Sequence, residues 1–206
     1  MKNKKVMEKI FDVVIILIVI ALYIFAGLFI YSNFRERKRN EISNKIIDKV
    51  DEQIKENTSN DNAATETETK VSYAGYNYTA IGKIRIKKIG IYQPILKENT
   101  KDSYNASVVK MSGPDLNTKG NVAIGGHNFM RGNFFIKINR LVKDDIVEIT
   151  DLSGKTVKYY VYEYGIVSAD EAGYLKQPDN KDDVMITLVT CTKGGKERYI
   201  VKAKAR

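Results

Sequence analysis

The sequence predicts an all-β domain, folded as an antiparallel barrel or sandwich, behind an N-terminal transmembrane helix. Three observations lead to this prediction. An uncharged apolar run fills residues 13–34, a polar segment follows from Thr58 to Lys70, and short strand-like runs recur at similar intervals through the rest of the chain. Regularly spaced short strands are typical of barrels and sandwiches and not of parallel α/β sheets.

The run from Val13 to Phe34 contains 22 consecutive residues without a formal charge, enough to cross a bilayer as a helix. Ser32-Asn-Phe-Arg35 follows it with no small-residue cleavage pattern, and no polar face interrupts it. We therefore expect an uncleaved signal anchor at 13–34, preceded by a short N-terminus at 1–12. Basic residues flank the run on both sides, so their count does not set the orientation.

The net charge of +9 does not indicate a nucleic-acid partner. Residues 1–40 carry eight Lys and Arg against three Asp and Glu, and the remaining 166 residues carry a net charge of only +4. No basic stripe interleaved with aromatic residues occurs in that remainder. We expect basic membrane flanks and a solvated surface.

Residues 35–71 predict an amphipathic helix and a linker. Apolar residues recur at helical spacing among charged ones, which indicates a packing or self-association face: Ile42, Ile46, Ile47, Val50 and Ile54. From Thr58 to Lys70 no large apolar side chain occurs, so this stretch has too little apolar surface to offset the entropy of ordering it.

Residues 72–206 form one domain's worth of chain. Strand-like runs begin with the isoleucine-rich stretch 81–91. Two alternating runs flank the turn-forming Asp151–Gly154 and predict a hairpin. The other strand-like runs are 122–124, 184–190 and 199–203, and a short helix is predicted from Phe134, Phe135, Ile138 and Leu141.

Cys191, His127 and Arg198 are the candidates for chemistry. Cys191 is the only cysteine and His127 the only histidine, and each follows an apolar strand-like run. A single cysteine has no intramolecular disulfide partner, so packing or thiol chemistry explains it. A nucleophilic cysteine needs a nearby base or cation, and His127 and Arg198 also lie at strand ends. Convergence of these ends on one groove is possible from the sequence alone.

We expect no cofactor. One cysteine and one histidine exclude a Cys/His metal set, and no phosphate-binding Gly-x-x-x-x-Gly-Lys motif is present. Acidic pairs at 144–145 and 182–183 indicate solvated loops, and calcium dependence is left open because the sequence does not place oxygen ligands.

Three stretches of the sequence resemble those of a known family. Thr187-Leu-Val-Thr-Cys191 with Arg198-Tyr-Ile-Val201 resembles the last strands of sortases, the cysteine transpeptidases of Gram-positive cell surfaces. Gly126-His127-Asn128 is similar to their Gly-His element, and Ile81 to Ile95 to their opening strands. The resemblance covers about residues 78–206. It implies an eight-stranded closed barrel with short helices, and a catalytic domain at 72–206.

The resemblance also implies roles. Cys191 would attack a Leu-Pro-x-Thr-Gly-like (LPxTG-like) sorting signal to form a thioester. His127 would act as acid and then base, and Arg198 would stabilise the oxyanion. An amine from a peptidoglycan precursor or a pilin lysine would resolve the thioester. The implied location is the cell membrane, single-pass, with the N-terminus cytoplasmic and the domain outside.

Departures from the family pattern bear on the subclass. Lys87 replaces a common proline, which bears on the shape of the substrate-side loop and on no catalytic group. No second span or inhibitory lid motif is apparent, and the segment 168–183 is short, which together favour a single-pass housekeeping or specialised anchoring enzyme of class D type. Three alternatives remain: a cysteine peptidase that releases product to water, a silent binding module with a buried Cys191, and a cell-wall L,D-transpeptidase. Enzymes of the last kind place an arginine two residues after the cysteine, where this chain has Lys193.

Overall fold

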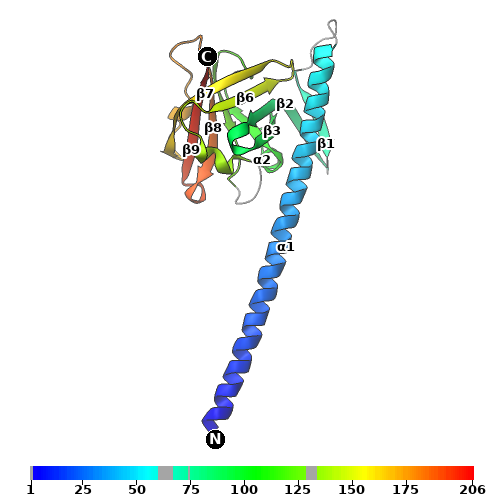
Figure 1. Cartoon of the computed structure of the whole chain (residues 1–206), viewed down its shortest axis with the longest axis vertical. Helices are drawn as coiled ribbons and strands as arrows, with labels where there is room; N and C mark the ends of the chain where they lie inside the picture. Colours follow the sequence, from blue (N-terminus) through cyan, green and yellow to red (C-terminus); the bar gives the residue numbers. More distant parts are fainter. Residues whose placement is uncertain (1, 60–66, 74, 129–133) are drawn as a thin grey trace. The chain divides into compact units, whose positions relative to one another are not determined.

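The computed structural model describes residues 2–59, 67–73, 75–128 and 134–206. The chain separates into two units, residues 1–38 and 39–206, and helix α1 (Lys2–Ser59) contributes to both (Figure 1). The helical stretch Ile10–Ser59, which begins in the first unit, is by length and composition long and apolar enough to cross a membrane. Its large apolar side chains, from Ile10 to Phe34, are exposed.

The second unit is built around a closed ring of eight strands (Figure 1). Around the ring the order is β2-β3-β4-β5-β8-β9-β7-β6, and β6 pairs back onto β2 to close it. This closure confirms the predicted eight-stranded barrel. The strands are β2 (Tyr76–Ile86), β3 (Ile91–Leu96), β4 (Val108–Ser112), β5 (Gly120–Gly125), β6 (Ile146–Asp151), β7 (Thr156–Ser168), β8 (Val184–Thr192) and β9 (Glu197–Ala205).

Short helices connect several of the strands, and the sequence predicts one of these helices. The 3-10 helix η2 (Phe135–Arg140) matches the helix expected from the phenylalanine-rich spacing, and β6 and β7 form the expected antiparallel hairpin. The segment 168–183 contains only the short 3-10 helix η3 (Gly173–Leu175). The other connections are α2 (Lys101–Ala106), η1 (Lys87–Ile89) and η4 (Lys193–Gly195).

Two features of the sheet differ from the sequence expectation. A ninth strand, β1 (Thr69–Tyr73), pairs with the first half of β2 and begins inside the expected linker. Of that linker, residues 60–66 lie outside the described residues. The barrel is also not purely antiparallel, because β3–β4 and β5–β8 are parallel pairs. Parallel pairs need a crossover, and α2 lies between β3 and β4.

One edge of β2 pairs with two strands in turn, β1 before Gly82 and β6 from Gly82 onward. The pairing with β3 shifts between Ala80 and Gly82, and β6 pairs only from Gly82 onward. Gly82 has a φ of 158°, and a β-carbon there would lie 2.5 Å from the Thr150 carbonyl oxygen. Only glycine fits this close approach of two backbones.

The barrel interior is filled by alternating side chains from all eight strands. Fully buried examples from distant parts of the sequence include Ile84, Ile124, Ile149 and Leu188. Because strand side chains alternate in direction, the intervening residues lie on the outer face of the barrel. That outer face is where the polar residues of β5, β8 and β9 are placed.

The second half of α1 is a packed part of the second unit. Ile42, Ile46 and Val50 are buried against β2, β3 and β4, through residues that include Ala80 and Leu96. Burying such side chains contributes roughly 1.5–3 kcal/mol each. Hence the amphipathic stripe predicted from the sequence is a packing face on the barrel, which excludes it as a free self-association surface.

Candidate active site

Cys191 lies near the end of β8 on the outer face of the barrel. Ile186 and Leu188 of the same strand are in the core, so alternation places position 191 outside. Its thiol is free and the residue is exposed. Burial, which the packing explanation and the silent-binding-module hypothesis both require, is not observed.

Arg198 pairs directly with Cys191 across the β8–β9 ladder. Residues that pair across antiparallel strands project from the same face with their β-carbons about 5 Å apart. The Arg198 Nη1 atom donates to the carbonyl oxygens of Gly195, at 2.8 Å, and Glu197, at 3.1 Å. These bonds fix the guanidinium against the turn between β8 and β9 and leave N–H donors on its other nitrogens.

His127 reaches the same place through the parallel pairing of β5 with β8. Gly125 pairs with Val189, so His127 and Cys191 each lie two residues beyond one register position. The Gly126 amide donates to the Val189 carbonyl at 3.0 Å, and the Thr190 hydroxyl donates to the Gly126 carbonyl at 2.7 Å. Parallel strands end at the same edge, which is why two residues 64 positions apart converge.

Asn128 completes this connection. Its Nδ2 donates to the carbonyl oxygen of Cys191 at 2.9 Å and so joins the end of β8 to the segment that carries His127. An open cavity of about 340 Å³ results, lined by His127, Asn128, Cys191, Thr192, Lys193, Gly194 and Gly195. The sequence analysis named Asn128 only as part of Gly126-His127-Asn128 and gave it no role of its own.

The imidazole of His127 favours its neutral form. Partial burial lowers the pKa of His127, and the positive charge of Arg39 on α1 lowers it further. The Tyr104 ring of α2 lies 5.4 Å from the imidazole ring, centroid to centroid, with a tilt of 50°. A neutral imidazole beside an exposed thiol can accept its proton, and a fixed arginine on the same face can bind an anionic oxygen.

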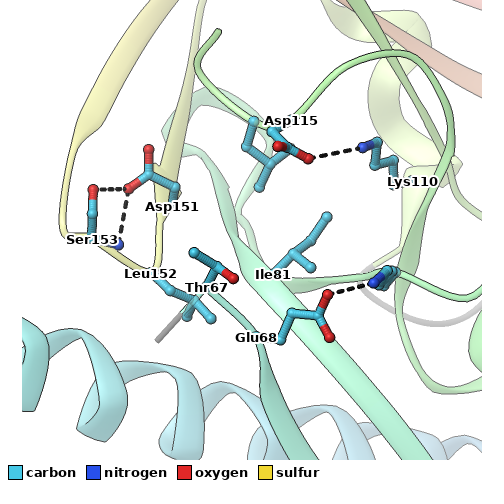
Figure 2. A pocket seen from close by; sticks show the side chains of 10 residues that line it. Thr67, Glu68, Ile81, Lys110, Asp115, Asp151, Leu152 and Ser153 are labelled. Carbon is cyan, nitrogen blue, oxygen red and sulfur yellow. Dashed lines mark hydrogen bonds and ion pairs between the residues drawn. The ribbon is translucent and has the colours of Figure 1, made fainter. Parts of the chain in front are cut away.

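A second cavity of about 360 Å³ lies among other residues (Figure 2). Its charged side chains already contact neighbours: Glu68 pairs with Lys97, and Asp115 with Lys110. Leu116 and Leu152 are among its apolar lining residues. It is lined by neither the cysteine nor the histidine, so it offers no thiol–imidazole pair.

The acidic pairs of the sequence analysis are occupied by ion pairs. Lys88 contacts Asp145 at 2.6 Å, and Lys204 contacts Asp183 at 2.7 Å. The partners of Asp144 and Asp182 are Arg206 and Lys119. Within residues 2–59, 67–73, 75–128 and 134–206, no group of three or more His, Cys, Asp or Glu residues is arranged to hold a metal ion.

Fold and site together define a β-barrel protein with a thiol, an imidazole and a guanidinium at one end of the β5–β8–β9 sheet. Comparison with known proteins identifies the family. The sortase domain family matches residues 84–206, more than half of the chain. The chain belongs to the sortase family, whose members are cysteine transpeptidases associated with the cell surface.

Individual relatives agree with this assignment. Sortase A of Bacillus anthracis is 24% identical over 204 residues, which cover 94% of this chain and 93% of the relative. A Clostridium perfringens sortase D5 transpeptidase structure is 28% identical with a TM-score of 0.58, covering 84% of this chain and 98% of that chain. Sortase A from Corynebacterium diphtheriae is 26% identical with a TM-score of 0.56, covering 62% and 60%. The class D type predicted from the sequence is consistent with the clostridial structure.

Proposed function

We propose that this protein is a membrane-anchored sortase that cleaves an LPxTG-like sorting signal and transfers the acyl group to an amine at the cell surface. One observation carries the proposal: the exposed thiol of Cys191 lines one cavity with His127, and Arg198 is its partner across the ladder. These are the residues to which we assign the roles of nucleophile, acid–base and oxyanion donor.

In the first half-reaction, neutral His127 takes the thiol proton as the Cys191 sulfur attacks the carbonyl carbon of the scissile peptide bond. The carbonyl oxygen becomes an oxyanion, and the Arg198 guanidinium stabilises it. The resulting imidazolium then donates its proton to the nitrogen of the leaving amine. The C–N bond breaks and a thioester remains. The lowered pKa of His127 supports this sequence because it keeps the resting imidazole able to accept a proton.

The second half-reaction runs in the opposite direction. An incoming amine, from a peptidoglycan precursor or a pilin lysine, attacks the thioester carbonyl while His127 removes the amine proton. The C–S bond breaks, an amide forms and the proton returns to the Cys191 sulfur. The open cavity leaves space for the amine beside the thiol. If water attacks instead, the protein acts as the cysteine peptidase among our alternatives.

We further propose the arrangement that the sequence predicted: residues 13–34 span the membrane, residues 1–12 face the cytoplasm and the domain lies outside. The exposed apolar helix of the first unit supports the anchor. The domain start expected at residue 72 stays a prediction, but a practical cut should also keep α1 from Ile42 to Val50, because it packs on the barrel. We therefore propose residues 39–206 as the catalytic unit.

The experiment uses the full-length chain in detergent or lipid nanodiscs with a panel of fluorogenic peptides related to Leu-Pro-x-Thr-Gly. Each peptide is tested with and without added amines, and ligated product is identified by mass spectrometry. Product that increases with amine indicates a transpeptidase, and hydrolysis alone indicates a peptidase. Equal signals from the wild type and Cys191→Ala across the panel would overturn the proposal.

A further inference from the structure

Tyr104 is an aromatic residue at the site to which the sequence analysis assigned no role. It lies on α2, the short crossover helix between β3 and β4. The helix is fixed locally, because the Thr100 side chain caps its N-terminus by accepting from the Ser103 amide at 3.2 Å. Ser103 and Ala106 are buried beneath it. Tyr104 therefore projects from a well-anchored segment.

The ring of Tyr104 contacts the only imidazole in the protein. The centroid separation of 5.4 Å and the tilt of 50° lie in the range of favourable aromatic pairs. Both residues are half-buried, so the ring covers one side of His127. Such a contact restricts the rotation of the imidazole, whose nitrogens must point toward the thiol for proton transfer.

The hydroxyl of Tyr104 extends over the outer face of β5. A β-carbon at Gly125 would lie 2.7 Å from the Tyr104 hydroxyl oxygen, so the glycine makes room for the phenol. Burial raises the pKa of Tyr104 most, the electrostatic interaction with Cys191 raises it further, and Arg198 acts in the opposite direction. The phenol is thus within electrostatic reach of both residues. Within the part of the chain that the structure describes, no side chain or backbone group forms a hydrogen bond with this hydroxyl.

Helix α1 supports α2 from another side. The Arg39 Nη2 atom donates to Asn105 Oδ1 at 3.3 Å, at the residue next to Tyr104. Ile42 and Ile46 of α1 pack in the same cluster as Ala106. The docked helix, α2 and His127 are therefore connected through consecutive contacts.

We propose that Tyr104 is the positioning residue for His127 through its ring, and that its hydroxyl binds the backbone of the peptide substrate in the groove. The proposal rests on the proposed function, because it requires a peptide to bind beside Cys191 and across the outer face of β5. An extended peptide presents carbonyl and amide groups, which a phenol can bind as donor or acceptor. A phenylalanine would supply the ring alone.

The test uses the full-length protein and two variants, Tyr104→Phe, which keeps the ring, and Tyr104→Leu, which removes it. Tyr164→Phe and Tyr164→Leu are matched controls, because Tyr164 is an exposed tyrosine on β7. Steady-state kinetics give kcat and KM for peptide and amine. Histidine-labelled protein gives the imidazole resonances of His127 without ambiguity, since it is the only histidine.

We expect Tyr104→Leu to lower kcat roughly tenfold to hundredfold and to shift the His127 resonances. Tyr104→Phe should leave those resonances unchanged and lower kcat/KM about threefold to tenfold through KM. Both Tyr164 variants should match the wild type. If Tyr104→Leu changes neither kcat nor the resonances, the positioning role is wrong; if Tyr104→Phe leaves KM unchanged, the hydroxyl role is wrong. Failure of the proposed function would instead appear as a wild type with no activity on any peptide, while the resonances would still report on the ring contact.

Discussion

Two cavities of the second unit, at Cys191 and at Asp115, have nearly equal volumes of about 340 Å³ and about 360 Å³, yet their chemistry differs. In the first, a thiol is exposed, and Arg198, the ladder partner of Cys191, donates to backbone carbonyls. In the second, lysines pair with carboxylates and the Asp151 carboxylate accepts from Ser153 (Figure 2). The same carboxylate also accepts from Asn117.

The difference teaches that volume does not locate function in this barrel. A group that already has its ionic or hydrogen-bonding partners gains little from a ligand, because binding would first have to break those contacts. The cavity at Cys191 keeps its reactive atoms accessible and fixes their neighbours through the backbone. Variants in each cavity test this difference.

The largest expected effect is on the nucleophile. Cys191→Ala should reduce kcat about 10³-fold or more, since no other residue at the site can form the thioester. In the second cavity, Asp115→Asn should change kcat/KM by less than about twofold, because Asp115 is a surface ion-pair partner. Peptide cleavage assays measure both. A comparable loss in both variants would remove the distinction between the cavities.

The next effect concerns the oxyanion donor. Arg198→Lys should lower kcat/KM about a hundredfold, because an ammonium does not reproduce a planar guanidinium that bonds Gly195 and the substrate together. Arg85→Lys, an exposed position on β2, is the control and should have wild-type kinetics. Equal kcat/KM for Arg198→Lys and the wild type would contradict the oxyanion role.

In the second cavity the expected effect is on stability. Leu152 is almost fully buried between the β6–β7 turn and the docked helix, so Leu152→Ala should lower the free energy of unfolding by about 2–4 kcal/mol. Activity per folded molecule should not change. Denaturant unfolding with active-site titration separates the two quantities, and exposed Val142→Ala serves as the control. Loss of kcat without loss of stability would show that this cavity takes part in the chemistry.

The smallest effect concerns the electrostatics of His127. Arg39 lowers the pKa of His127 because a nearby cation disfavours the imidazolium. Removing that charge in Arg39→Ala should raise the pKa, so the imidazole protonates at higher pH and the acid limb of the activity profile moves upward. Burial is the larger cause and remains, so the shift should be modest. The exposed Lys49→Ala on the same helix is the control.

NMR titration of the single histidine measures the Arg39 effect directly. The charged and titratable neighbours to consider are Arg39 from α1, Tyr104 from α2 and Cys191 from β8. An unchanged or lowered pKa in Arg39→Ala would exclude the electrostatic role of the docked helix. Lys49→Ala should titrate as the wild type does.

Much of the fold could be predicted because apolar alternation is a local signal. The β6–β7 hairpin, the η2 helix and the apolar span follow directly from such patterns. Closure of the barrel through β2 and β6, and the count of eight strands, followed only from the family resemblance. Strand β1 was missed because it begins with the polar residues Thr69 and Lys70. It pairs with the first half of β2.

The candidate site was predicted in part. Cys191 and His127 were conspicuous as single residues of their types, and Arg198 was singled out through its strand position. Their proximity depends on a parallel β5–β8 register, which no local pattern encodes. Tyr104 was missed for the same reason, since α2 reaches His127 only in the folded barrel. Their assigned roles stay predictions until the variants are measured.

The parallel β5–β8 pair also has a consequence for biosynthesis. The strand that leads to His127 is made some 60 residues before its partner strand, and the arginine comes later still, on β9. A nascent polypeptide emerging from the ribosome or the translocon therefore carries an imidazole without its thiol while residues 128–190 are being made. If the three residues act as we propose, reactivity arises only when the late strands dock, and an incompletely synthesised or incompletely folded chain should not react with bystander peptides.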